Sequence, residues 1–162
     1  MDDPRDGGSV RAPQIEDVVS ICKSLNEAGA RYLLIGGFAV IAHGASRTTK
    51  DIDFLVDPDP ANIALIKKAL SSLPDDAASE IKDTDVVDYS VVRIADEVMI
   101  DLLGVACGVT YESAWPDSQI FELDDTEIPI ASKQTLIATK NTVRPSDHMD
   151  RAFLQALIDE EG

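Results

Sequence analysis

Two carboxylates stand inside an apolar run, and this run limits the possible folds more than any other segment. Residues 51–56 read DIDFLV, so Asp51 and Asp53 alternate with apolar residues. Side chains two residues apart in a strand point to the same face, so the two aspartates share one face and the alternate apolar residues line the other. Like charges held this close favour a cation between them. The alternative is an edge strand whose aspartates face solvent, but Leu55 shares their face and fits solvent poorly.

A third carboxylate repeats this pattern. Asp101 lies in the segment EVMIDLLGV, whose apolar flanks predict a central strand over residues 98–103. A buried carboxylate in such a strand is costly unless it is paired or bound to metal. Together with Asp51 and Asp53 it can chelate two Mg²⁺ ions, an arrangement that serves phosphoryl or nucleotidyl transfer. The alternative is that Asp101 meets a backbone N–H or Arg93 on a paired strand.

Gly36 and Gly37 follow a short apolar run at residues 31–35. We expect a buried strand there, a tight turn at the glycines and a short helix over residues 38–43, which stops at Gly44. Backbone N–H groups at such a turn can approach a phosphate, and the dipole of the following helix favours negative charge. Taken alone, two glycines are also typical of an ordinary strand-to-helix turn.

The rest of the chain mixes helices and strands. Apolar residues at helical spacing predict a helix over residues 14–28 that Gly29 ends. Further predicted elements are a strand at 51–56, a helix at 61–70, paired strands at 89–94 and 98–103, a second pair at 119–123 and 127–130, and helices at 133–141 and 147–160 with Ser132 and Ser146 as N-caps. This order predicts an α/β (α+β) fold, a mixed sheet flanked by helices. We expect a flexible N-terminal segment at residues 1–13 and a single domain over residues 14–162.

Charge and cysteine content restrict the partners. The chain has 30 acidic and 14 basic residues, a formal charge of −16, which argues against a long nucleic acid but less against a nucleotide that arrives with a divalent cation. Cys22 and Cys107 have no CxxC spacing, so neither a zinc site nor a disulfide framework is indicated. No apolar signal region and no stretch of about 18 apolar residues occur, so we expect a cytoplasmic protein without a membrane segment.

Together the motifs resemble the nucleotidyltransferase superfamily related to DNA polymerase β. The segments LLIGGFAVIAHG, RTTKDIDFLV and VMIDLLG follow its pattern of hydrophobic-Gly-Gly, then Asp-x-Asp, then an acidic residue on a later strand. The closing segment LIATKNTVRPSDHMDRAFLQAL is similar to small bacterial members that include abortive-infection-type toxins. In these a lysine, an Arg-Pro pair and spaced acids mark the helices after the sheet.

The resemblance implies roles for eight residues. The expected metal ligands and catalytic residues are Asp51, Asp53 and Asp101, the last also activating the acceptor hydroxyl. The expected substrate-binding residues are Gly36, Gly37, Arg47, Thr49 and Lys140, the last as a contact to the triphosphate. A solvated loop is the alternative for Arg47 and Thr49. For Lys140, Arg144, Asp147 and Asp150 the alternative is surface ion pairing along the helices.

The implied reaction moves a nucleoside monophosphate from an NTP donor to a hydroxyl group and releases pyrophosphate. The acceptor is a small molecule, a tRNA end or a protein, and two Mg²⁺ ions are expected. A cognate antitoxin protein is the implied macromolecular partner. The alternative is a catalytically silent nucleotide- or protein-binding module of the same fold, as part of a toxin–antitoxin pair, because some superfamily members keep the fold without the chemistry.

Overall fold

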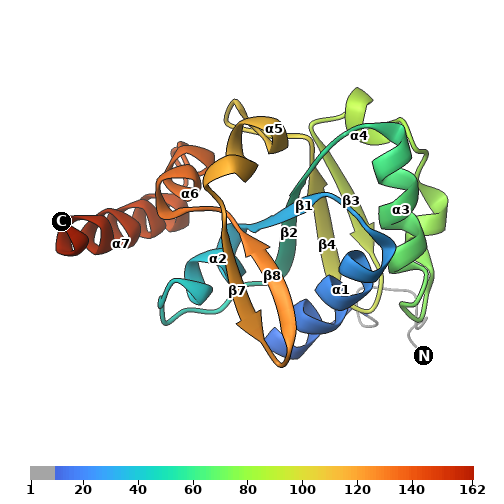
Figure 1. Ribbon diagram of the computed structural model, residues 1–162, viewed down its shortest axis with the longest axis horizontal. Helices are drawn as coiled ribbons and strands as arrows, with labels where there is room; N and C mark the ends of the chain where they lie inside the picture. Colours follow the sequence, from blue (N-terminus) through green and yellow to red (C-terminus); the bar gives the residue numbers. More distant parts are fainter. Residues whose placement is uncertain (1–9) are drawn as a thin grey trace.

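Six strands form one mixed sheet in the order β3-β4-β2-β1-β8-β7 (Figure 1). The structure is a computed structural model that describes residues 10–162. β2 runs parallel to β4 and β1 parallel to β8, whereas the other neighbouring strands are antiparallel. The strands are β1 (Tyr32–Ile35), β2 (Asp51–Val56), β3 (Val91–Ala95), β4 (Met99–Leu103), β7 (Gln119–Leu123) and β8 (Thr126–Ile130). The predicted single-domain mixed sheet is confirmed.

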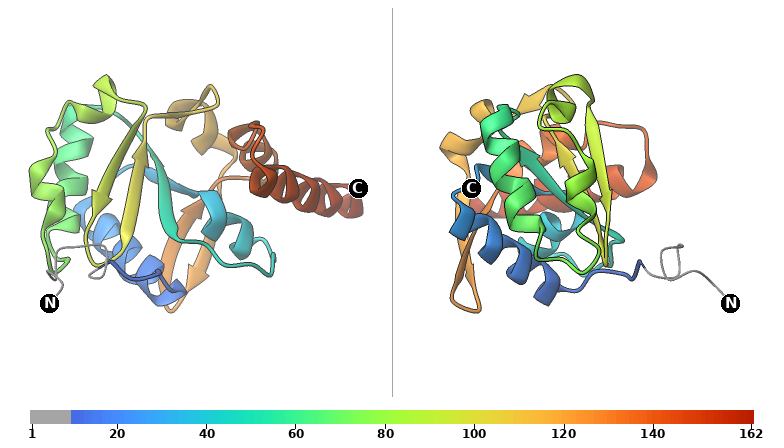
Figure 2. Two further views of the ribbon diagram at one scale, coloured as in Figure 1. Left: turned by 180° about the vertical axis from the view of Figure 1, so that it is seen from behind. Right: turned by 90° about the vertical axis from the view of Figure 1, so that its right-hand side faces the viewer.

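Helices α1 (Ile15–Ala28) and α3 (Pro60–Leu70) cover one face of this sheet. Figure 2 shows both helices on the same side of the strands. The apolar positions of β2 point to them: Phe54 shares a small apolar space with Leu25 of α1 and Ile66 of α3. All three side chains are fully buried. This layer explains why Ile52, Phe54 and Val56 alternate with the two aspartates.

The opposite face is partly open along β3 and β4. In β3 the residues of this face, Val91, Arg93 and Ala95, are exposed, while Val92 and Ile94 are buried. The other elements are α2 (Gly36–Ala42), the hairpin of β5 (Val105–Ala106) and β6 (Val109–Thr110), α5 (Tyr111–Ala114), α6 (Lys133–Thr139) and α7 (Pro145–Glu161). In Figure 1 α6 and α7 lie at the end of the molecule remote from α3.

The predicted helices and strands are all present, with ends shifted by one or two residues. Gly29 ends α1 in the left-handed conformation with φ 77°. The hairpin of β5 and β6 and the short elements η2 (Ala77–Glu80), α4 (Asp85–Asp88), α5 and η3 (Trp115–Asp117) were not predicted. Each of these has four residues or fewer, which is too short for a periodic pattern.

The predicted N-cap at Ser146 is wrong. α7 begins two residues earlier than predicted, at Pro145, with Arg144 in the N-cap position. Proline suits the first helical position because its ring fixes a helical φ and because its missing N–H has no partner there anyway. Ser132 does cap α6, where its hydroxyl accepts a hydrogen bond from the backbone N–H of Thr135 at 3.1 Å.

Arg11 connects the start of the described chain to the domain. Its guanidinium donates to Asp17 at 2.6 and 2.7 Å and to Glu97 at 3.3 Å. Residues 1–9 of the predicted flexible segment lie outside the described residues. Between residues 10 and 162, no helix has the length and apolar character needed to cross a membrane.

Candidate active site

Asp51, Asp53 and Asp101 meet on the open face of the sheet. Asp53 and Asp101 are direct partners in the parallel pair of β2 and β4. Each aspartate offers a carboxylate oxygen, and the three oxygens lie within 4.8 Å of one another. The predicted convergence of the three carboxylates is therefore confirmed. Three hard oxygen donors at this separation are a suitable ligand set for a divalent cation.

Gly36 allows the backbone to pass directly against Asp53. Its φ is +72°, and a Cβ atom built on it would lie 2.2 Å from Oδ2 of Asp53. Gly37 has a similar relation to Thr49, since its Cβ would lie 2.7 Å from the Cβ of Thr49. Close packing therefore requires glycine at both positions, Gly36 against the Asp53 carboxylate and Gly37 against Thr49.

Replacing Gly36 with alanine is expected to lower the free energy of unfolding by about 3 kcal/mol or more, because the new Cβ adds a clash to an unfavourable φ. Gly29→Ala is the matched control, with φ +77° and no atom within 4 Å of its Cβ. It is expected to cost about 1 kcal/mol from backbone strain alone. Urea denaturation of the two variants measures the difference. Equal losses of unfolding free energy in the two variants would show that the backbone at Gly36 does not pack tightly against Asp53.

Burial, as the largest cause, and the negative charges of Asp101 and Asp51 together raise the pKa of Asp53 to about 7, against a smaller lowering by Lys140. A buried carboxylate is usually stabilised by hydrogen bonds, as at Asp96, which accepts three backbone N–H bonds at 2.8 to 3.0 Å. Among residues 10–162, no N–H or hydroxyl group acts on Asp53 in this way. Its charge is therefore poorly compensated by the chain itself.

Arg93 of β3 forms a fork across two of the three carboxylates. It lies opposite Asp101 in the antiparallel pair of β3 and β4. Its Nε donates to Asp101 Oδ1 at 2.8 Å, and its Nη2 donates to Asp101 Oδ2 at 3.0 Å and to Asp51 Oδ2 at 3.3 Å. The two expectations for Asp101, an acidic cluster and an ion pair with Arg93, are thus both met.

A buried charged cluster lies beside this triad. Lys140, at the end of α6, is 6% exposed, and Asp147 and Asp150 of α7 are 4% and 5% exposed. Lys140 Nζ lies 3.0 Å from Asp150 and 3.6 Å from Asp147. Surface ion pairing, one interpretation of this spacing, is therefore wrong for these three residues. The side chains are buried because α6 packs on α7 along this face.

The cluster also holds Arg47, which donates from Nη1 to Asp150. Burial would raise the pKa of Asp147, but the Thr142 hydroxyl, Lys140 and Arg144 together lower it below the ordinary value. The Thr142 hydroxyl donates to Asp147 at 2.6 Å and Arg144 Nε at 3.0 Å. Arg47 and Lys140 are thus engaged with acids of α7.

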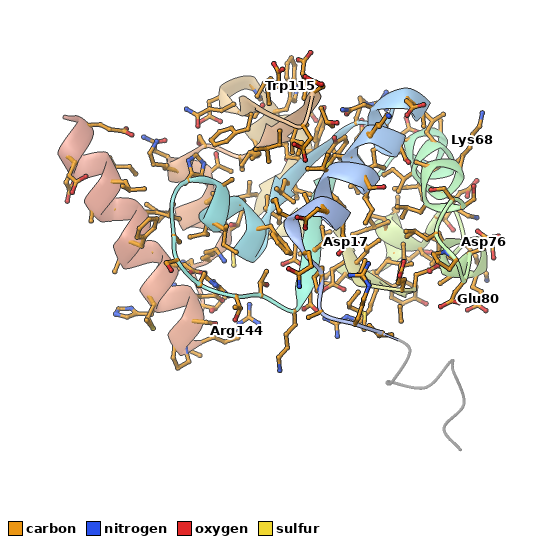
Figure 3. All side chains as sticks on the ribbon, turned by 90° about the horizontal axis from the view of Figure 1, so that it is seen from below. Asp17, Lys68, Asp76, Glu80, Trp115 and Arg144 are labelled. Atoms are coloured by element: carbon orange, nitrogen blue, oxygen red, sulfur yellow. The ribbon has the colours of Figure 1, made fainter. Side chains whose placement is uncertain are left out.

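A small cavity of about 90 Å³ joins the triad to the charged cluster. Its lining includes Gly36 and Asp53 from the sheet side and Lys140, Arg144 and Asp147 from the helix side. A larger cavity of about 550 Å³ is lined by Arg31, Asp57 and Trp115, among others, and by none of the three aspartates of the triad. Figure 3 shows Trp115 and Arg144 at opposite edges of the molecule.

The sequence interpretation gave no role to three residues at this site. Arg144 and Asp147 line the small cavity. Asp147 and Asp150 pair with Lys140, and Asp150 also pairs with Arg47. The three-residue interval from Asp147 to Asp150 places both on one helix face. That interval was the available signal, but spacing alone does not say whether a charged face is buried.

A protein-family model described as "Nucleotidyl transferase AbiEii toxin, Type IV TA system" matches residues 21–151. The region contains the glycine turn, all three aspartates of the triad and the charged cluster. Such a fold with such a site defines a nucleotidyltransferase. The chain belongs to the AbiEii nucleotidyltransferase toxin family, as its resemblance to abortive-infection-type toxins implied.

A solved structure shares the fold of this chain. The crystal structure of the lincosamide antibiotic adenylyltransferase LnuA with bound lincomycin has the same fold, with a TM-score of 0.55 and 15% sequence identity. The similarity covers 90% of this chain and 99% of LnuA. A search of curated proteins gives no match.

Proposed function

We propose that this chain transfers a nucleoside monophosphate from an NTP to a hydroxyl group in a Mg²⁺-dependent reaction at Asp51, Asp53 and Asp101. The observation that carries the proposal is the convergence of three carboxylate oxygens within 4.8 Å on an open sheet face. Membership of a nucleotidyltransferase family supports the reaction class. The acceptor oxygen forms a bond to the α-phosphorus, and the bond from that phosphorus to the β-phosphate oxygen breaks, so pyrophosphate leaves.

The residues at the site fit a hard divalent cation. All three donors are carboxylate oxygens, which Mg²⁺ prefers, and Asp53 has no N–H donor within residues 10–162 to balance its charge. Asp51, Asp53 and Asp101 would hold the two ions. Bound Mg²⁺ would supply charge neutralisation at the phosphates and activation of the attacking oxygen.

The chain itself would position the two substrates. Gly36 and Gly37 bring backbone close to Asp53, where a phosphate could accept N–H bonds, and Thr49 packs against this turn. Asp101 would accept the proton of the acceptor hydroxyl. Lys140 and Arg47 would contact the triphosphate, which requires them to exchange Asp150 for phosphate oxygens.

The binding partners follow from charge and family. The family description names a type IV toxin–antitoxin system, which supports a cognate antitoxin. A formal charge of −16 favours a small or cationic acceptor over a long nucleic acid. LnuA is described as a lincosamide adenylyltransferase, so lincosamides belong in the acceptor panel beside tRNA and proteins.

A catalytically silent binding module is the second candidate function. One observation favours it: Lys140 and Arg47 are both paired with Asp150, so neither is free for a triphosphate. A thermal-shift titration separates the candidates. Stabilisation by NTP only with Mg²⁺, removed by Asp53→Ala, favours the enzyme, because the triad then binds Mg²⁺-NTP. No stabilisation by any NTP, together with tight binding to the product of a neighbouring gene, favours the silent module.

The direct test is transfer of label from α-³²P-NTP, with Mg²⁺, to the acceptor panel. Asp51→Asn is expected to remove the labelled product, because it takes away one carboxylate ligand and its charge. Asp57→Asn is the matched control, since Asp57 follows the same strand but pairs with Arg31 at 2.8 Å, outside the triad. It should keep the activity. An active Asp51→Asn protein would overturn the assignment of the ligands.

A further inference from the structure

Arg93 and a divalent ion would use the same oxygen atoms. The guanidinium of Arg93 contacts both oxygens of Asp101 and Oδ2 of Asp51. These are two of the three carboxylates that the proposed function assigns to Mg²⁺. A planar fork on two carboxylates is a strong, directional contact for a cation that stays charged.

We propose that Arg93 is an internal competitor of the metal, so that a divalent ion binds the triad only as the guanidinium leaves Asp51. The inference rests on the proposed metal site of the triad. The longest contact of the Arg93 guanidinium, 3.3 Å to Asp51, is the one that breaks. Its contacts to Asp101 are shorter, at 2.8 and 3.0 Å. Arg93 thereby lowers the affinity for the metal and holds Asp101 in place.

The position of Arg93 permits this movement. It lies on the edge strand β3, on the open face of the sheet, and its side chain is 55% exposed. The guanidinium can therefore swing into solvent without disturbing the apolar core. Its substitution should leave the fold intact for the same reason, because the buried residues of β3 are Val92 and Ile94 on the other face.

The test is titration with Mn²⁺, a paramagnetic substitute for Mg²⁺, followed through the spectrum of the free ion without nucleotide. Arg93→Met is expected to bind Mn²⁺ about tenfold more tightly than the wild type, as loss of one charged competitor implies. Arg31→Met is the matched control, because Arg31 makes a similar exposed ion pair with Asp57 away from the triad. It should bind like the wild type.

Arg93→Lys separates competition from a general effect of charge. Lysine keeps the charge but cannot span two carboxylates with a planar fork. We expect Arg93→Lys to bind Mn²⁺ more tightly than the wild type and less tightly than Arg93→Met. If Arg93→Lys matches the wild type, or if Arg93→Met binds no more tightly, the competition is refuted.

Asp51→Asn distinguishes failure of this inference from failure of the proposed function. If Mn²⁺ binding depends on Asp51 but not on Arg93, only the competition by Arg93 is wrong. If Asp51→Asn binds Mn²⁺ like the wild type, or if no variant binds it, the metal site itself is wrong and the competition with it.

Discussion

Asp53→Asn is expected to abolish nucleotidyl transfer and, in the same protein, to raise stability at pH 8 in EDTA. The loss of transfer should be about 10³-fold or greater, because the proposed metal site loses a ligand and several kcal/mol of transition-state stabilisation with it. The gain in stability has a separate cause. Burial and two neighbouring negative charges oppose the ionised form of Asp53, and asparagine carries no charge.

The extra stability of Asp53→Asn over the wild type should increase with pH. The pKa of Asp53 rises from 3.8 in the unfolded chain to about 7 in the folded protein, so the folded protein holds this proton more firmly. The stability that this proton supplies is complete below pH 4 and is lost as the pH rises through 7. Asp53→Asn should therefore equal the wild type near pH 3.5 and exceed it at pH 8 by up to about 4 kcal/mol.

Urea denaturation in EDTA measures the free energy of unfolding of the two proteins at pH 3.5 and at pH 8. The transfer assay on the same preparations shows whether the more stable protein is the inactive one. Equal stability of the two proteins at pH 8 would contradict the unfavourable charge at position 53. Normal transfer by Asp53→Asn would contradict its place in the metal site.

Asp150→Ala is expected to destabilise the protein by about 3 kcal/mol, the usual cost of removing one partner from a buried ion pair. Asp150 is the acid that holds both Lys140 and Arg47, and its side chain is 7% exposed. Its loss leaves Lys140, also buried, with only the 3.6 Å contact to Asp147. The melting temperature should fall by roughly 6 to 12 °C for a chain of this size.

Asp83→Ala is the control for this prediction. Asp83 pairs with Lys67 at 3.1 Å, but its side chain is 47% exposed. An exposed pair of this kind contributes less than about 1 kcal/mol, so the melting temperature should barely move. Calorimetry on both variants makes the comparison. Equal effects of Asp83→Ala and Asp150→Ala would mean that burial does not strengthen the cluster at α7.

The sheet was predictable because its strands carry their own signal. The continuous apolar run of β1 reflects a strand that is buried on both faces. The alternation in β2 reflects a strand with one apolar face, and both patterns can be recognised in the local sequence. The same alternation placed Asp51 and Asp53 together. To place Asp101 beside them needed one more inference, that β2 and β4 are neighbours. The cost of a buried carboxylate suggested it, and the strand register confirms it.

The charged cluster was harder to predict, because its burial depends on how two helices pack. Lys140, Asp147 and Asp150 have the spacing of an ordinary exposed helix face, and local sequence does not reveal that α6 packs on α7 there. The short elements between residues 105 and 117 were not predicted, for a different reason. They are held by short-range caps, such as the Thr110 hydroxyl that accepts from the backbone N–H of Ser113, and not by a long periodic pattern.

The parallel pairing of β2 with β4 has a consequence for the order of events during translation. Parallel neighbours need a crossover, and here the crossover is the whole segment from residue 57 to residue 98, including α3 and β3. A nascent chain that has left the ribosome only as far as β2 carries Asp51 and Asp53 without their third partner. The three carboxylates therefore cannot assemble while the first half of the message is being translated, and the site is complete only after β4 has left the ribosome and paired with β2.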